Sequence, residues 1–350
     1  MSTIRAVATA VPAHRVPQAE AREFAEALFE GAFSDIGRLL SVFEHGHVES
    51  RHFAAPPEWF RRDHTFAEKN ELYVDTAEEL AERAASDCLQ QAGLTPDQVD
   101  HVIFVSTTGL STPSIDARLV NRMKLRRNVR RTPIWGLGCA GGAAGLSRAH
   151  EYTKAYPAHR ALVIAVELCG LTFQRNDLSK SNLIAVSLFG DGAAAVLICG
   201  DETESPGPRI LATRSNLWYD SLDVMGWKID DGGLKVLFSR DIPAIVRKAV
   251  LPNLLEFLEP EGLDLGAIRH LVAHPGGAKV MDAYTEVFGL RNGQMDHARS
   301  VLRRYGNMSS PTVLFVLNEF LRAGDIGASE HGVITALGPG FSSELLLFRG

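Results

Sequence analysis

Short apolar runs rich in β-branched residues recur along the chain and alternate with stretches whose apolar positions have helical spacing. Such runs are typical of buried strands, whereas the spacing of three and four predicts helices. The strands are expected at residues 101–109, 161–167, 193–200, 270–277, 332–340 and 344–348. The helices are expected at 74–94, with Thr76 as N-cap and Gly93 as stop, and at 241–258 and 311–323. This alternation predicts an α/β protein with buried sheets.

The second half of the chain repeats a pattern of the first. Residues 94–109 and 263–277 both run from a helix end through a polar link to a His and a buried strand. A Gly-flanked turn that opens a helix follows each strand at a similar distance. We therefore predict two duplicated halves, residues 1–205 and 206–350, whose equivalent loops face one site. The break is expected in the segment 201–209 (DETESPGPR), which contains Pro and Gly.

Composition narrows the class of protein. The chain has 350 residues, of which 45% are hydrophobic and 22% charged, as expected of a globular protein. The formal net charge of −6 gives no reason to expect a nucleic-acid partner. Four Cys without a CxxC pair disfavour a zinc ribbon or a disulfide framework and suit a reducing compartment. No apolar run approaches the roughly 20 residues of a membrane span, so we expect a cytoplasmic protein.

The segment GLGCAGGAAG at 136–145 is the strongest candidate for chemistry. Cys139 stands there at a helix start among residues with almost no side chain, so that a substrate can approach the thiol closely. The positive end of the helix dipole is expected to favour the thiolate. The alternative for a Cys is a small buried core residue. We prefer that interpretation for Cys88, Cys169 and Cys199, which lie on helix or strand patterns.

The same segment also matches a dinucleotide-binding pattern. GLGCAG has the form G-x-G-x-x-G, and Glu167 at the end of the following strand could hold a ribose. Two observations disfavour this interpretation. A thiol stands where the pyrophosphate must pass, and Glu167 lies farther beyond the Gly motif than the ~20 residues that usually separate the motif from the ribose-binding acid. An NAD-binding oxidoreductase therefore remains as an alternative of a different class.

A nucleophilic Cys needs a base and an oxyanion site. His274 ends an apolar strand and is followed at once by Pro-Gly-Gly, which places it at a sheet edge where ligands of α/β proteins bind. Asn307 lies in a similar turn, YGNMSSP, where a Ser can cap the next helix and Pro311 suits its first turn. Taken alone, Asn307 could be a simple left-handed turn residue. Cys139, His274 and Asn307 on three Gly turns together predict a catalytic triad.

At this point the chain resembles a known family. GCAGG around Cys139, LFGDGAA at 188–194, AHPGG around His274, YGNMSS around Asn307 and GPGFSSE at 338–344 are similar to motifs of the type III polyketide synthases, in the same order. The resemblance covers essentially the whole chain and implies an α/β thiolase-like fold of five αβαβα layers. Within the family it is greatest to bacterial enzymes that make alkylpyrones. The alternative in the same fold is a ketoacyl-ACP synthase III-like enzyme, in which the His precedes Gln-Ala-Asn instead of Pro-Gly-Gly.

The resemblance implies an acyltransferase mechanism. Cys139 takes the starter from a fatty acyl-CoA, with His274 as its ion-pair partner. His274 and Asn307 then stabilise the enolate that forms as malonyl-CoA loses CO₂, and the enolate attacks the acyl-Cys. The product cyclises to a pyrone. No metal or cofactor is implied beyond the CoA thioesters, and the enzyme is expected to be a homodimer.

The resemblance also implies substrate-binding residues. Phe189 corresponds to a gatekeeper aromatic that orients the malonyl group, and Phe238 to a second aromatic at the cavity mouth; core packing is the alternative for both. Gly338, Pro339 and Gly340 would shape the cyclisation pocket. Arg51 aligns with a basic stretch that serves the CoA phosphates. Plant members carry a Met that reaches into the partner's cavity, and Thr112 stands there in this chain.

Overall fold

The computed structural model describes residues 1–203, 205–239, 241–291 and 293–350. The helices of this part of the chain are α1 (Gln18–Leu28), α2 (Ile36–Leu40), α3 (Val42–His45), α4 (Phe66–Ala92), α5 (Ile115–Arg122), α6 (Gly141–Ala155), α7 (Lys180–Leu188), α8 (Ile242–Leu258), α9 (Ala278–Val287), α10 (Asp296–Tyr305) and α11 (Ser310–Ala323). The strands are β1 (Ser2–Ala10), β2 (His14–Pro17), β3 (Ser50–Phe53), β4 (His101–Val105), β5 (Arg130–Ile134), β6 (Arg160–Leu168), β7 (Asp191–Gly200), β8 (Arg209–Leu217), β9 (Met225–Asp230), β10 (Gly233–Phe238), β11 (Ile268–Ala273), β12 (His331–Gly338) and β13 (Ser342–Arg349).

The strand order confirms the predicted duplication. In the described residues the main sheet runs β11-β12-β13-β8-β1-β7-β6-β4-β5. In the N-terminal part β4 is parallel to β6, whereas β6–β7 and β7–β1 are antiparallel. In the C-terminal part β11 is parallel to β12, whereas β12–β13 and β13–β8 are antiparallel. Thus β4, β6, β7 and β1 correspond to β11, β12, β13 and β8, which is the repeat expected from residues 94–109 and 263–277.

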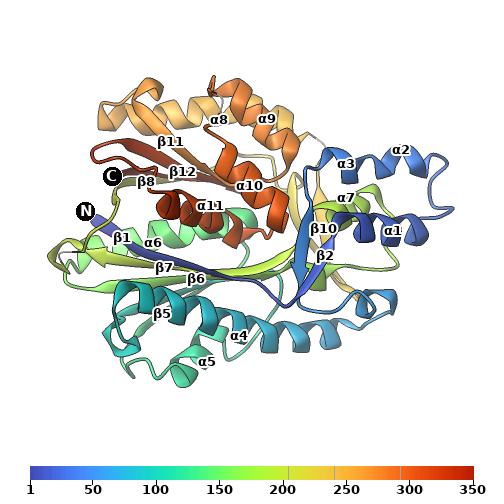
Figure 1. The fold of residues 1–350 in the computed structure, drawn as a ribbon, viewed down its shortest axis with the longest axis horizontal. Coiled ribbons are helices and arrows are strands. Elements are labelled where there is room, and N and C mark those ends of the chain that lie inside the picture. The colour runs from blue at the N-terminus through green and yellow to red at the C-terminus, as the bar shows by residue number, and fades with distance from the viewer. Residues whose placement is uncertain (204, 240, 292) are drawn as a thin grey trace.

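The two halves stack as five layers, with helices outside and between the sheets (Figure 1). Helices α4 and α5 cover the N-terminal part of the sheet, α8 and α9 cover the C-terminal part, and α6 and α11 lie between them. Strands buried on both faces need apolar side chains on both, which is why the expected strands read as continuous apolar runs. Every residue of β7 is buried, and α11 is buried along most of its length.

The expected strands and helices are present, but one helix boundary differs. Helix α4 begins at Phe66 instead of near Thr76, because Thr65 and Glu68 form a capping box that satisfies the first free N–H groups. Its end at Gly93 is confirmed: this residue has φ 72°, the left-handed conformation that favours glycine. The predicted half boundary at 205/206 stays a prediction, and Glu204 next to it lies outside the described residues.

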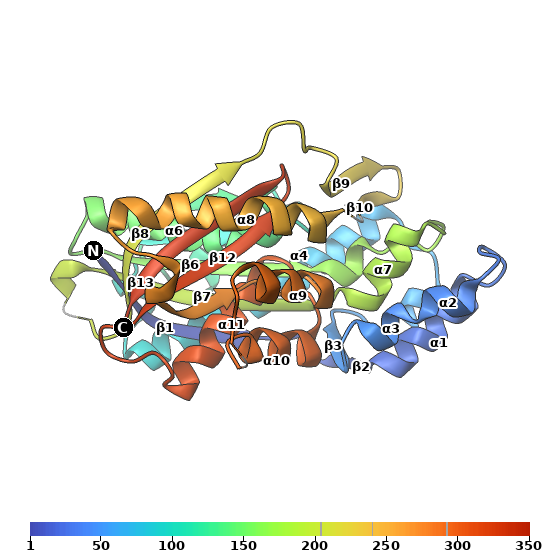
Figure 2. The ribbon, with the colours of Figure 1, turned by 90° about the horizontal axis from the view of Figure 1, so that it is seen from above.

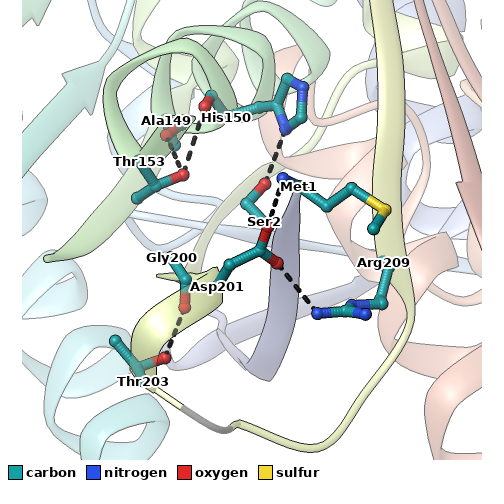
Figure 3. Close-up of polar contacts among 9 residues, drawn as sticks. All are labelled: Met1, Ser2, Ala149, His150, Thr153, Gly200, Asp201, Thr203 and Arg209. Carbon is teal, nitrogen blue, oxygen red and sulfur yellow. Dashed lines mark hydrogen bonds and ion pairs between the residues drawn. The ribbon is translucent and has the colours of Figure 1, made fainter. Parts of the chain in front are cut away.

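The two halves also meet through the start of the chain. Strand β1 pairs with β8 only at Ser2 and Thr3. Figure 3 shows the polar contacts around this junction: the Met1 ammonium lies 2.5 Å from Asp201 Oδ2, and Asp201 also accepts a hydrogen bond from Arg209. Ser2 Oγ lies 2.7 Å from the ring of the buried His150 on α6. The junction therefore ties β1, β8 and the central helix together.

A smaller unit extends from one end of the layers (Figure 2). It contains α1–α3, the β2–β3 ribbon, α7 and the β9–β10 hairpin. Its apolar centre comprises Phe29, Leu40 and Phe43, with Leu183 from α7. No helix of the described residues is long and apolar enough to cross a membrane.

Candidate active site

The two central helices approach each other most closely where they begin. A Cβ on Gly142 at the start of α6 would lie 2.2 Å from the carbonyl oxygen of Ser310 at the start of α11, and a Cβ on Gly141 would lie 2.6 Å from Val105. Such distances are shorter than any real contact, so only glycine permits this approach. The glycines therefore bring the turn that contains Cys139 against the turn that contains Asn307.

Cys139 lies in a 3₁₀ turn, Gly138–Ala140, directly before α6, and its thiol is buried. Burial raises the pKa of the thiol to about 11, whereas hydrogen bonds from the side chains of Ser309 and Asn307 oppose this shift. Ser309 has φ 57° and ψ −126°, an unusual conformation for a residue with a side chain. Strain of this kind persists where the surroundings fix it, and at functional sites it serves to orient groups.

Asn307 connects the cysteine to the His274 turn. Its Nδ2 donates to the carbonyl oxygen of Gly276 at 2.9 Å, and its Oδ1 accepts from the N–H of Ser309 at 2.7 Å. The amide therefore has a fixed orientation, and it retains one N–H to donate. The left-handed positions of this turn are Gly306 and Ser309, not Asn307, so the alternative of a simple left-handed turn residue does not apply.

His274 follows β11 directly, as predicted, and its backbone N–H donates to Thr335 of β12 at 2.8 Å. The imidazole is buried, and neither ring nitrogen has a hydrogen-bond partner among the residues that the structure describes. Burial lowers the pKa of His274 to about 3. An unpartnered buried imidazole beside Gly276 and the Asn307 amide has both nitrogens available to a substrate.

Burial opposes the expected thiolate. It raises the pKa of Cys139 and lowers that of His274, and it therefore favours the neutral form of both groups. The helix dipole contributes about 0.3–1 kcal/mol at an ordinary site, which is too little to offset the loss of water around the thiol. The arrangement instead suits a neutral imidazole that accepts the thiol proton as the sulfur attacks.

Phe189 and Phe238 lie together beside this site. The backbone of Phe189 pairs with that of Asn307: Asn307 N–H donates to Leu188, and Gly190 N–H donates to Asn307. The ring of Phe189 lies 5.8 Å from that of Phe238 on β10 and 6.3 Å from that of Trp227 on β9. The two phenylalanines thus form one aromatic group, whose first ring is attached to the backbone of Asn307.

The loop after β12 packs directly on the cysteine turn. A Cβ on Gly138 would lie 2.8 Å from Pro339, and a Cβ on Gly338 would lie 2.5 Å from the carbonyl oxygen of Leu137. Gly340 has φ 129°, which disfavours any side chain, and a Cβ there would lie 3.0 Å from Leu217. The predicted Gly338-Pro339-Gly340 loop is therefore part of the same site as Cys139.

Arg51 differs from the expectation of a cation that meets CoA phosphates at the surface. It is only 1% exposed. Its guanidinium donates to the carbonyl oxygens of Val186 and Phe189 and to the side chain of Gln18. These internal acceptors use the donors that a phosphate would need.

Glu167 also has a different environment from the predicted ribose-binding position. It is fully buried and accepts hydrogen bonds from Thr107 N–H, the Thr108 hydroxyl and the Ser310 hydroxyl. Burial raises its pKa to about 7, and these hydrogen bonds oppose the shift. The carboxyl group joins β6 to the start of α11 directly beneath Cys139. Sequence reasoning missed this network because its members lie in three separate segments.

An apolar pocket lies beside Phe189. It encloses about 780 Å³, including the solvent at its mouth, and Glu20 and Arg61 contribute to its lining. Most of the wall is apolar and includes Ala21, Phe24, Phe53, Phe60, Cys169, Phe173, Ala185, Phe189 and Val236. Cys169 was expected to be core filler; it is buried, but it also lines this pocket. Burial is the main reason that the pKa of Cys169 lies well above its usual range, and Glu167, Asp191 and Cys139 contribute less, so these three groups lie within electrostatic range of the pocket wall.

The expected core cysteines Cys88 and Cys199 are buried and unpaired, as predicted. Among the described residues, no group of three or more His, Cys, Asp or Glu is arranged to hold a metal ion.

Family models match almost the whole chain. The N-terminal domain of chalcone and stilbene synthases matches residues 1–202, and the C-terminal domain of the same enzymes matches residues 211–350. The chain belongs to the chalcone and stilbene synthase family. It is therefore a type III polyketide synthase, an acyltransferase that condenses malonyl-CoA units.

Individual relatives agree with the family models. The synthase is 48% identical to a chalcone synthase homologue from Bacillus subtilis (strain 168), over 99% of this chain and 98% of that protein. It is 38% identical to the 1,3,6,8-tetrahydroxynaphthalene synthase of Streptomyces peucetius subsp. caesius, over 99% of this chain and 93% of the relative. The solved 1,3,6,8-tetrahydroxynaphthalene synthase of Streptomyces coelicolor A3(2) superposes with a TM-score of 0.95 at 28% identity and covers 99% of both chains.

The family membership decides between the alternatives. The NAD-binding alternative for GLGCAG is wrong, because Gly138 packs against Pro339, Gly141 packs against Val105 and Ser310, and Glu167 is occupied internally. The thiolase-like fold is confirmed. The family models favour the chalcone synthase branch over a ketoacyl-ACP synthase.

Proposed function

We propose that the synthase loads a fatty acyl starter from CoA onto Cys139 and extends it with malonyl-CoA to an alkylpyrone or a related cyclised product. The observation that carries this proposal is the apolar pocket that Phe189 and Cys169 line, because the backbone of Phe189 pairs with that of Asn307. Its aromatic and aliphatic wall suits an alkyl chain. Removing a methylene group from water stabilises the bound chain by about 0.8 kcal/mol.

Loading begins with the neutral thiol of Cys139. His274 takes the thiol proton as the sulfur attacks the thioester carbonyl, the S–CoA bond breaks, and the CoA thiolate recovers the proton from His274. Ser309 and Asn307 stabilise the developing charge on the sulfur through the hydrogen bonds that already oppose the raised thiol pKa. The result is an acyl-Cys139 thioester and free CoA.

Extension uses the other two residues of the triad. When the malonyl carboxylate leaves as CO₂, the electrons of the broken C–C bond move to the thioester oxygen. The free N–H of Asn307 and a ring N–H of His274 donate to this oxygen. The enolate carbon then attacks the acyl carbonyl and forms a new C–C bond, while the Cys139 sulfur leaves. Phe189 orients the malonyl group, with Phe238 beside it, and the Gly338-Pro339-Gly340 loop bounds the space in which the product cyclises.

A homodimer belongs to the same proposal. Two large apolar side chains, Leu110 at 44% and Trp135 at 48%, are exposed near the start of the cysteine loop. Trp135 Nε1 donates to the carbonyl oxygen of Gly109, the residue before Leu110, and this hydrogen bond links the two segments. Sedimentation equilibrium of the protein and of Trp135→Glu tests this assignment: the charge should shift a dimer toward monomer, and a monomeric parent protein would refute it.

The starter proposal is tested with a panel of acyl-CoAs of increasing chain length and labelled malonyl-CoA, with mass spectrometry of the products. Ala185 lines the pocket, so Ala185→Trp should lower kcat/KM for long-chain starters about tenfold or more relative to acetyl-CoA. The neighbouring Ile184 is 39% exposed, and Ile184→Trp is the matched control with an unchanged preference. A product without an alkyl chain, such as 1,3,6,8-tetrahydroxynaphthalene, would contradict the fatty starter.

A further inference from the structure

Arg51 is a buried charged side chain, and its burial requires a structural explanation. Removing a guanidinium from water is costly, and an apolar side chain of similar size would often be tolerated at least as well. Burial lowers the pKa of Arg51 to about 9, although the nearby charge of Asp191 opposes the shift. Asp191 itself accepts hydrogen bonds from the N–H groups of Gly170 and Ala54. The pair therefore belongs to a buried network in which each partner has a specific set of contacts.

The guanidinium caps the end of α7. Its Nη1 donates to the carbonyl oxygens of Val186 at 2.6 Å and Phe189 at 2.9 Å, and its Nη2 donates to Gln18 Oε1 at 2.8 Å. Gln18 in turn donates to the carbonyl oxygen of Ser187 at 2.8 Å. These carbonyls have no partner within the helix, and a cation there also complements the negative end of the helix dipole. One planar group thus fixes the backbone from which the Phe189 ring projects.

The stem of Arg51 lies against both segments that carry site residues. A Cβ on Gly190 would lie 3.3 Å from Arg51 Cβ, and a Cβ on Gly306 would lie 2.7 Å from Arg51 Cγ. Gly190 and Gly306 are the neighbours of Phe189 and Asn307, whose backbones pair with each other. Arg51 therefore contacts the Phe189 segment through its guanidinium and the Asn307 segment through its stem.

We propose that Arg51 is a positioning residue for malonyl decarboxylation, which holds residues 186–190 against Asn307 so that the Phe189 ring and the Asn307 amide face the malonyl thioester in one fixed geometry. The proposal rests on the roles proposed above for Phe189 and Asn307. In the loading of Cys139, Asn307 gives only the weaker of two hydrogen bonds to the sulfur, the other coming from Ser309, so loss of Arg51 slows decarboxylation much more than loading. A merely structural role would weaken both steps together.

Arg51→Lys tests this division because lysine keeps the charge and most of the stem but cannot reach three acceptors in a plane. Acyl-Cys139 formation, followed by intact-protein mass spectrometry, should stay within about twofold of the parent enzyme, whereas release of labelled CO₂ from malonyl-CoA should fall about tenfold to a hundredfold. Arg126→Lys is the matched control, since Arg126 is half-buried and pairs with Asp100 at 2.7 Å away from these segments. It should keep the parent ratio of the two rates.

Gln18→Leu keeps the experiment decisive if Arg51→Lys does not fold, because it removes one acceptor of Arg51 and the donor to Ser187 while Arg51 remains. It should shift the ratio in the same direction by about threefold to tenfold, less than Arg51→Lys, because Arg51 keeps its hydrogen bonds to Val186 and Phe189. The proposal is wrong if the folded variants have the same ratio of loading rate to decarboxylation rate as the parent enzyme, or if both rates fall equally. Asn307→Ala separates this failure from that of the proposed function: normal decarboxylation there would refute the role of Asn307 itself.

Discussion

The two halves of the synthase have the same strand order, yet they bring different chemistry to the site. In the N-terminal half, the central helix α6 starts with small residues and presents a thiol. In the C-terminal half, the equivalent helix α11 starts with Ser310-Pro311 after an unusual backbone conformation at Ser309. The turn before it presents the amide of Asn307, and the separate turn after β11 presents the imidazole of His274. The duplicated scaffold places two equivalent turns face to face, and the side chains of those turns divide the reaction between them.

This comparison teaches which positions are free to diverge. Glycines 141 and 142 must stay small because α11 occupies the space of their side chains. The turn residues immediately before each helix have no such constraint and can carry a nucleophile or a donor. We therefore expect the nucleophilic step and the decarboxylation step to fail separately when one half is changed.

Removing the reactive group of each half should give the largest effects. Cys139→Ala abolishes the acyl-enzyme and condensation, because no sulfur is left to hold the starter, and leaves decarboxylation measurable. Asn307→Ala forms the acyl-enzyme but loses decarboxylation about 10²–10³-fold, as expected for one oxyanion donor. Mass spectrometry of the protein and release of labelled CO₂ measure the two steps. An acyl adduct in Cys139→Ala would refute the assignment of the nucleophile.

Separating the two helix starts should impair both halves at once. Gly142→Ala places a methyl group 2.2 Å from a backbone oxygen that cannot move freely, so the free energy of unfolding should fall by about 1–3 kcal/mol. Loading and decarboxylation should both slow. Gly37→Ala in α2 is the control, since nothing lies within 4 Å of a Cβ there. Urea unfolding measures the stability of both variants, and the two rate measurements follow loading and decarboxylation. Equal stability of Gly142→Ala and Gly37→Ala would contradict the close approach of α6 to α11.

The protonation state of the pair can be read from alkylation of Cys139. Because burial raises the pKa of the thiol to about 11, the thiolate fraction and hence the iodoacetamide rate should rise about tenfold per pH unit between pH 6 and 10. A plateau between pH 6 and 9 would instead indicate a thiolate–imidazolium pair. His274→Gln distinguishes the two cases. For a neutral pair, the dependence of the alkylation rate on pH should stay the same in this variant; for an ion pair, the plateau should be replaced by a rise with pH.

The buried Glu167, which connects the two halves beneath the cysteine, should give the smallest effect. Its pKa in the folded protein is about 7, above its ordinary value of 4.5. The stabilisation is therefore complete below pH 4.5 and is lost as the pH rises through 7. Glu167→Gln should flatten the fall in Tm between pH 5 and 7.5 by a few degrees. Asp191, whose pKa is also raised to about 7 by burial, stays in both proteins, so an unchanged slope would exclude Glu167 as the cause.

Much of the fold could be predicted from the sequence because each buried strand is a continuous apolar run within one short segment. The apolar runs that became β4, β6, β7, β11, β12 and β13 were predicted as strands, and the repeat predicted their equivalence across the halves. The N-cap of α4 was predicted at Thr76 but is Thr65, about three helical turns earlier, because Thr65 and Glu68 form a capping box ahead of the apolar pattern. A local signal existed there, but the periodicity outweighed it.

The candidate site divides in the same way. Cys139, His274 and Asn307 stand out in the sequence because each lies in a Gly turn with a distinctive residue type, and the Gly338-Pro339-Gly340 loop shares that signal. Arg51 offered only its charge. The local sequence around an arginine is the same whether its side chain reaches solvent or is buried. The burial of Arg51 against Val186, Phe189 and Gln18 therefore could not be inferred.

The sequence by itself determined the family, the layered α/β architecture and the three side chains to which we assign the chemistry, because residue type, strand pattern and Gly turns are local properties. Only the tertiary structure decided the electrostatics. It placed the thiol and the imidazole out of water, which favours the neutral form of each, surrounded Glu167 with donors from distant segments, and placed Arg51 against the backbone of Val186 and Phe189. Burial and hydrogen bonding depend on which segments meet, and that information is spread over residues far apart in the chain.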